Sequence, residues 1–207
     1  MFRNLFNPEN ALMITMTQIT DCIFHSLFWL LGCFPVITIG ASFAALYDGV
    51  YHCYRKGDKH SWGRFLKTFR RNWKSAIIPT VVMLLCASLL GKGLISLWNL
   101  AAVGRISMVL FSAAAFAGVL AVGIGSILFP LLSRFETGLI QLFRNTVLLG
   151  LANMPRTLLL GILNTMTIIL CALYVFPLFF LPALSALLGT LFLEPMFKPY
   201  MQTEDAA

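Results

Sequence analysis

The sequence predicts an all-α membrane protein, a polytopic bundle of five or six transmembrane helices that forms one integral-membrane domain over residues 1–207. Hydrophobic residues make up 59% of the chain, charged residues make up 11%, and the mean hydropathy is +0.85. A soluble domain carries about 25% charged residues. Apolar runs long enough to cross a bilayer as helices recur along the chain, and the basic residues lie between them.

The first apolar run extends from Ile14 to Tyr54 and is interrupted by Gly32, Pro35 and Gly40. Its 41 residues are about twice one span. It therefore predicts either one span followed by an interfacial helix or a hairpin of two short spans that turns near residues 35–40. Glycine, proline and hydroxylated residues are typical of a segment that satisfies its own backbone where a helix breaks in the membrane. In this turn they predict structural roles for Thr38, Gly40 and Ser42.

Four later runs predict one span each, over residues 76–97, 106–132, 158–176 and 183–197. The total is five if the first run crosses once and six if it crosses twice. Six accounts better for the first run, because a 41-residue helix is far too long for a single crossing.

The basic residues predict the orientation. Twelve of the fifteen lysines and arginines fall on one side of this arrangement: Arg55, Lys56, Lys59, Arg64, Lys67, Arg70, Arg71, Lys74, Arg134, Arg144, Arg156 and Lys198. Positively charged loops face the cytoplasm. We therefore predict a protein of the bacterial cytoplasmic (inner) membrane with its C-terminus in the cytoplasm. Arg134, Glu136 and Arg156 lie where spans leave the bilayer, and are candidates to pair with each other or with the loop of a partner.

Residues 61–74 predict an amphipathic helix on the cytoplasmic side. Its apolar residues follow helical spacing and form one stripe: Trp62, Phe65, Leu66, Phe69 and Trp73. Basic residues, Arg70 among them, occupy the remaining faces. Such a helix lies in the headgroup layer with its cations on anionic lipid. The alternative is a docking surface for a cytoplasmic or membrane partner.

Small residues predict a close helix contact in the run that begins at Ile106. Ala113, Ala117, Ala121 and Gly125 recur every four residues. Helix association in lipid depends on packing, and small residues at this spacing let two backbones approach. The contact lies either within the chain or with another subunit.

Four ionisable residues fall in or beside the apolar runs and are candidates for an intramembrane polar role: Asp21, His25, Asp48 and Lys92. A charge inside a bilayer costs several kcal/mol, so each of these residues needs a structural or functional explanation. Asp21 and His25 are four residues apart and share one helix face, where they form either a structural pair or the start of a proton path. A proton path needs more such groups than the later spans contain.

Motifs of catalysis are absent from the sequence. The three histidines form no HExxH motif, and neither GxSxG nor GxxxxGK[ST] occurs. The five cysteines include no CxxC pair and no metal-ligand spacing, which favours thiols that pack as small hydrophobes. We therefore predict a protein that is not an enzyme, with no catalytic, cofactor-binding or metal-binding residues and no nucleic-acid partner.

Three strings resemble the YesL-type family of small bacterial membrane proteins, and they arrive in the order expected of that family. They are residues 30–47 with PVITIGAS and AALY, residues 65–74 (FLKTFRRNWK), and residues 129–136 (FPLLSRFE) followed by 153–158 (NMPRTL). Asp48-Gly49 departs from the family pattern, which continues with apolar or aromatic residues.

The resemblance implies a membrane partner. Such proteins are often encoded beside carbohydrate ABC importers of Gram-positive bacteria. We therefore expect a non-enzymatic accessory or assembly subunit that binds the permease subunits of such an importer, and with them their ATPase. Two alternatives stay open, namely a self-sufficient transporter or channel and a scaffold that senses lipid charge through residues 61–74.

Overall fold

The computed structural model describes residues 11–56, 61–104, 107–135 and 138–204, which are helical and contain no strand. In chain order the elements are α1 (Ala11–Cys33), η2 (Val36–Thr38), α2 (Ile39–Lys56), α3 (Ser61–Asn72), α4 (Ile77–Ala102), α5 (Met108–Arg134), α6 (Leu139–Ala152), α7 (Met154–Leu173), η3 (Phe176–Phe179) and α8 (Leu181–Glu204). The prediction of an all-α fold is confirmed. Glu136 and the side chain of Trp62 lie outside the described residues.

The first apolar run folds as a helical hairpin of α1 and α2. The turn falls between Cys33 and Ile39, where the interruption by glycine and proline predicts it. The two helices are antiparallel, because Gly32 packs against Ser42 near the turn while Tyr54 donates a 3.0 Å hydrogen bond to the Sγ of Cys22 at the open end.

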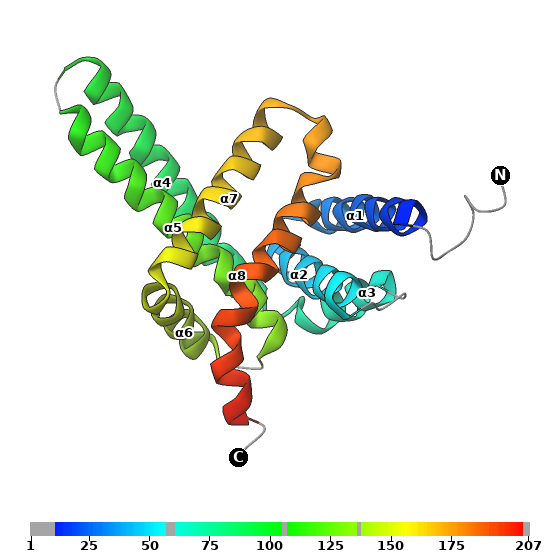
Figure 1. Ribbon diagram of the computed structural model, residues 1–207. Coiled ribbons are helices and arrows are strands. Elements are labelled where there is room, and N and C mark those ends of the chain that lie inside the picture. Colours follow the sequence, from blue (N-terminus) through cyan, green and yellow to red (C-terminus); the bar gives the residue numbers. More distant parts are fainter. Residues whose placement is uncertain (1–10, 57–60, 105–106, 136–137, 205–207) are drawn as a thin grey trace.

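Helix α2 occupies the centre of the fold (Figure 1) and packs against α1, α3, α4, α5 and α8. Small residues permit this. Ala41, Ala44 and Ala45 are fully buried, and a Cβ at Gly40 would lie 2.2 Å from Thr80 Oγ1 of α4. A helix with small side chains on several faces lets its neighbours approach closely from more than one side.

Helices α4 and α5 form a long hairpin that extends away from the rest of the fold (Figure 1). We call α4 together with the N-terminal half of α5 the arm. Only 6% of the most apolar stretch of α4 is buried, against 50% of the corresponding stretch of α5. Most of the apolar surface of the arm therefore faces outward.

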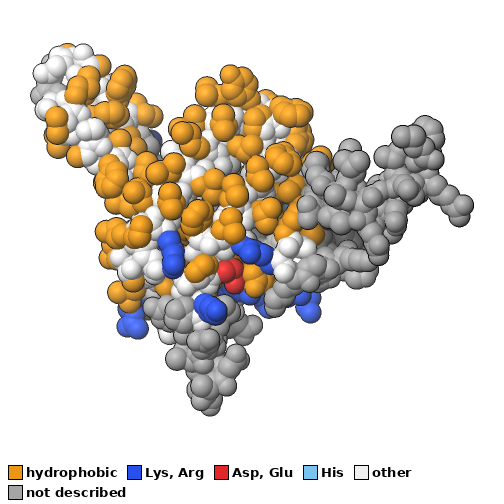
Figure 2. Space-filling view, in the orientation of Figure 1, with side chains coloured by type: hydrophobic (Ala, Val, Ile, Leu, Met, Phe, Trp, Pro, Cys, Tyr) orange, Lys and Arg blue, Asp and Glu red, His pale blue; other side chains and the backbone are white. Residues whose placement is uncertain are grey.

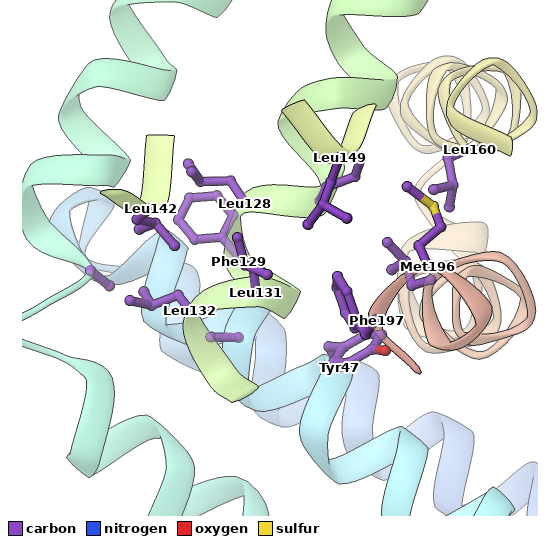
Figure 3. Close-up of a cluster of buried hydrophobic side chains, with 14 of the residues drawn as sticks. Tyr47, Leu128, Phe129, Leu131, Leu132, Leu142, Leu149, Leu160, Met196 and Phe197 are labelled. Carbon is purple, nitrogen blue, oxygen red and sulfur yellow. The ribbon is translucent and has the colours of Figure 1, made fainter. Parts of the chain in front are cut away.

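The main hydrophobic core lies where the C-terminal half of α5 meets α2, α6, α7 and α8. Figure 3 shows Phe197 of α8 close to Tyr47 of α2, and Leu160 of α7 beside Met196. Residues 127–133 of α5 are all buried, so this end of α5 anchors the fold while its other end carries the arm.

Three of the described helices, α4, α5 and α7, are long and apolar enough to cross a membrane. This is fewer than the five or six spans predicted from the apolar runs. The shortfall arises at the two ends of the chain. Helix α2 carries Asp48 and His52, and α8 carries Glu194 and Lys198 in its second half, so the apolar part of each is shorter than a span.

Helix α6 has no counterpart among the predicted elements. The sequence indicates only a basic connection between residues 132 and 158, but residues 139–152 of that connection are helical. With 14 residues, α6 is about 21 Å long and too short to cross a bilayer.

Candidate functional site

Polar side chains gather around the second half of α2, and Asp48 lies at the centre of one group. Its Oδ2 accepts a 2.6 Å hydrogen bond from Thr68 Oγ1 and a 3.3 Å hydrogen bond from Arg64 Nε, both of α3. His52 Nδ1 lies 3.2 Å from Asp48 Oδ1. Asp48 and Thr68 are buried. This carboxylate therefore holds α3 against α2.

A second polar group joins three helices on the neighbouring face of α2. Glu194 of α8 forms a 2.5 Å ion pair with Arg134 at the end of α5, and it accepts a 2.8 Å hydrogen bond from Tyr47 Oη. The guanidinium of Arg134 lies 3.9 Å from the ring centre of Tyr51, a cation–π geometry. We call Tyr47, Tyr51, Arg134 and Glu194 the clasp.

The two groups are continuous, because Tyr47 and Asp48, and likewise Tyr51 and His52, are sequence neighbours on α2. Arg71 adds a further link by donating a 2.8 Å hydrogen bond to the carbonyl of Ser133. Four helices (α2, α3, α5 and α8) are thus tied together by charged and polar contacts at one end of the bundle. Among the described residues, no group of three His, Cys, Asp or Glu side chains is arranged to hold a metal ion.

The predicted pairing of Asp21 with His25 takes a different form in the structure. His25 Nδ1 lies 2.7 Å from the backbone oxygen of Asp21, and the Asp21 carboxylate is 3.5 Å from the Sγ of Cys53. His25 is buried, and its Nε2 faces Gly49, where an added Cβ would lie 2.9 Å away. The pair is therefore part of the α1–α2 contact. Lys92 is exposed on α4, far along the chain from these residues.

Hydroxyl groups at the turn form hydrogen bonds with backbone groups. Thr38 Oγ1 donates to the carbonyl oxygens of Gly32 and Pro35, at 2.7 Å each. Ser42 Oγ donates to the Thr38 carbonyl at 3.0 Å, and the amide of Gly40 donates to Thr80 Oγ1 at 3.2 Å. These contacts join the turn to α4.

Of the predicted loop residues, Arg134 belongs to the clasp, whereas Arg156 makes a local contact. Arg156 donates a 3.3 Å hydrogen bond to the Asn153 side chain at the start of α7, where Pro155 occupies the first turn. Glu136 lies outside the described residues, and Arg134 pairs with Glu194 of α8, which is distant in the sequence.

The predicted small-residue face of α5 divides between two environments. Gly125 is buried against Met83 of α4, and Ala121 is half-buried. Ala117 and Ala113, one and two turns nearer the tip of the arm, are exposed. The face thus serves an internal contact at one end and stays open at the other.

One close helix crossing involves two glycines that the four-residue spacing does not single out. A Cβ at Gly123 of α5 would lie 2.2 Å from the Thr157 oxygen of α7, and one at Gly161 of α7 would lie 2.2 Å from the Val119 oxygen of α5. Real side chains never approach a backbone oxygen so closely, so α5 and α7 pack backbone to backbone. In the sequence, each of these glycines is only a small residue in one of two different spans. Their contact depends on the tertiary structure.

The predicted amphipathic helix is α3, but its apolar stripe is largely used inside the protein. Phe65 is buried, and its ring lies 5.9 Å from that of Phe28 in α1. Phe69 is half-buried in the same cluster. Trp73, after the end of α3, is exposed beside Lys74, and Arg70 is exposed as well. Phe65 therefore faces protein, so only part of the predicted apolar stripe is open to a headgroup layer.

Most of the described cations lie towards one end of the surface, whereas Lys92 lies on α4. Figure 2 shows the lysine and arginine side chains in the lower part of the view, with hydrophobic side chains covering the region above them. The clasp and the Asp48 group belong to the same end, since Arg134 ends α5 and Arg71 closes α3.

Replacing Asp48 with leucine should detach α3. The change leaves the buried Thr68 hydroxyl and the half-exposed Arg64 without their shared acceptor. A buried hydrogen bond to a charged group contributes about 2 kcal/mol, and the exposed part of the Arg64 pair adds little. We expect amide hydrogen exchange in residues 63–72 to rise at least about tenfold, while exchange in α7 stays unchanged. Asp48→Asn, which keeps an acceptor oxygen, should have a smaller effect, and equal effects of both variants contradict the role of the charge.

The first part of the chain matches a known family model. Residues 10–94 match the family described as "Protein of unknown function, DUF624". No curated protein and no solved structure matches the chain. YesL-type proteins are members of the DUF624 family, so the match supports the predicted resemblance over α1, α2, α3 and most of α4. Over these residues the chain is similar to the DUF624 family.

Proposed function

We propose that the protein is a non-enzymatic accessory or assembly subunit of a carbohydrate ABC importer, which binds the permease subunits, and with them their ATPase, through a helix face inside the membrane. One observation supports this proposal above the others. Ala113 and Ala117 form an exposed small-residue surface on an apolar hairpin whose outward faces have no cover within the described residues.

Small exposed residues on a membrane helix favour a protein neighbour over lipid. Lipid chains adapt to any apolar surface, whereas a small-residue stripe gains most from a second helix that approaches it closely. Gly125 of the same face already accepts Met83 of α4 in this way. The resemblance to the YesL-type family supplies the identity of the partner, a permease of a carbohydrate importer.

The charge distribution supports an orientation for this complex. The end of the bundle that carries the clasp, Arg71 and Lys198 faces the cytoplasm of a bacterial inner membrane under the positive-inside rule, which puts the C-terminus there too. A total of five or six spans requires that α8 and one or both helices of the α1–α2 hairpin cross as well. Reporter fusions after Lys56, Arg105 and Lys198 test this orientation.

The alternative, a self-sufficient transporter or channel, needs a polar path across the bilayer. The described polar contacts of Asp48 and Arg134 instead join neighbouring helices at one end. Solute flux into liposomes that contain only this chain is the result that favours the alternative.

Ala113→Leu combined with Ala117→Leu should release the partner. Two leucines on the exposed face block close approach, and a clash of about 1.4 kcal/mol already weakens binding about tenfold. The measurement is co-purification of permease chains with the tagged protein in gentle detergent. Ala172→Leu, an exposed alanine on α7, is the matched control. Unchanged recovery with the double variant, in protein that remains monodisperse, rules out this face as the interface.

A further inference from the structure

Helix α6 has two apolar sides, and the protein covers only one of them. The covered side carries Leu142, Leu149 and Gly150, which pack on the main core and on Ile124 of α5. On the other side, four large apolar residues are exposed: Ile140, Val147, Leu148 and Leu151. Ile140 is the most open of them, with 88% of its surface exposed.

The exposed residues form one continuous face that includes a cation. Relative to Ile140, the positions Arg144, Val147, Leu148 and Leu151 are four, seven, eight and eleven residues further along, which is the spacing of one helix side. Arg144 therefore lies within the apolar face, and its side chain is exposed. An arginine in this setting reaches water or a phosphate with its guanidinium while its methylenes stay on the apolar surface.

The connections of α6 restrict where it can lie. Four residues separate it from the end of α5 and one residue separates it from the start of α7, and both of these helices are long and apolar enough to cross a membrane. Figure 1 shows α6 nearly end-on, whereas α5 and α7 run across the view, so α6 crosses them. A helix too short to span, and held between two spans at the end that carries Arg134, lies along the bilayer surface.

We propose that α6 is the interfacial helix of this protein, with Ile140, Val147, Leu148 and Leu151 among the lipid chains just below the headgroups and Arg144 on a phospholipid phosphate. The sequence assigns this role to residues 61–74. The structure favours α6 because the buried Phe65 of α3 faces protein, whereas four large apolar residues of α6 are exposed on one side of the helix. This inference does not depend on the importer proposal.

Spin-label depth measurements test the proposal. A variant without the five cysteines receives a single cysteine at Leu148, is labelled, and is reconstituted into vesicles of phosphatidylethanolamine and phosphatidylglycerol. Cysteines at the exposed Arg55 and at Leu89 in the middle of α4 provide the aqueous and the deep reference. We expect the label at Leu148 to collide with oxygen more, and with a water-soluble nickel chelate less, than the label at Arg55, at a depth between the two references.

Two results overturn the proposal. A label at Leu148 as accessible to the nickel chelate as that at Arg55 means that the face is in water. A label shielded from both reagents means that protein covers it. If the cysteine-free chain does not fold, a benzoylphenylalanine photocrosslinker at Ile140 in the otherwise unchanged protein distinguishes contact with lipid from contact with protein in native membranes. A phospholipid adduct supports the proposal, and a protein adduct or no lipid adduct contradicts it.

Discussion

Gly161→Ala should destabilise the protein by about 3 kcal/mol, because overpacking at a tight contact costs this much or more when the backbone must move. The new Cβ would lie 2.2 Å from the carbonyl oxygen of Val119, so α5 and α7 must separate. Gly123→Ala meets the Thr157 oxygen at the same distance and should have a similar effect. Thermal unfolding in mild detergent, followed by size-exclusion of the heated samples, measures the loss.

Gly93→Ala is the matched control for this prediction. Gly93 lies inside α4, and a Cβ there would meet no atom within 4 Å. Since alanine is the better helix former by about 1 kcal/mol, this variant should be as stable as the parent or more stable. Equal unfolding temperatures for the Gly161 and Gly93 variants would show that α5 and α7 do not cross backbone to backbone.

Glu194→Leu should cost about 3 kcal/mol, the loss expected when one member of a largely buried ion pair is removed. The change leaves Arg134 without its carboxylate and Tyr47 without its acceptor. The contact of Arg134 with the Tyr51 ring limits the loss, because cation–π contact persists without the glutamate. The free energy of unfolding, obtained by detergent titration, is the quantity to measure.

The double variant Arg134→Met with Glu194→Leu separates the ion pair from its desolvation cost. Replacing both members of a buried pair with apolar residues is often neutral or stabilising. We therefore expect the double variant to be more stable than Glu194→Leu alone. Lys198→Gln, an exposed charge change on the same helix, should leave stability within about 0.5 kcal/mol of the parent. If the stability losses of Arg134→Met alone and of Glu194→Leu alone add up to the loss of the double variant, Arg134 and Glu194 act independently.

Hydrophobicity along the chain predicts most of the helices, because a helix that crosses a membrane is apolar over most of its length. The runs at 76–97, 106–132 and 158–176 correspond to α4, α5 and α7. The turn between α1 and α2 falls at the break near Pro35, and Thr38 donates to backbone oxygens there, since backbone groups in an apolar setting need local partners.

The span count and the role of α6 depend on tertiary contacts that hydropathy does not report. Residues 39–50 of α2 are largely buried by other helices, so their apolar character reflects packing within the protein as much as contact with lipid. Helix α6 escapes prediction because it is short and its polar residues resemble those of a connecting loop. Its apolar residues lie on two sides of the helix, so it lacks the single stripe by which residues 61–74 are predicted.

The candidate site could be predicted only in part for the same reason. Asp48 stands out in the sequence as an acid in an apolar run, but its partners Arg64 and Thr68 are identified by the fold of α3 onto α2. Glu194 also stands out in the sequence, as the first acid after the apolar half of α8. Its pairing with Arg134, 60 residues earlier in the chain, depends on how α5 and α8 meet.

The most direct test of the importer proposal is a pull-down of the tagged full chain from its native membrane in gentle detergent, with mass spectrometry of the proteins that accompany it. The proposal predicts stoichiometric recovery of two permease chains and an ATPase of a carbohydrate importer. Recovery of this chain alone, under conditions in which known importers remain intact, would contradict it and favour a protein that acts by itself.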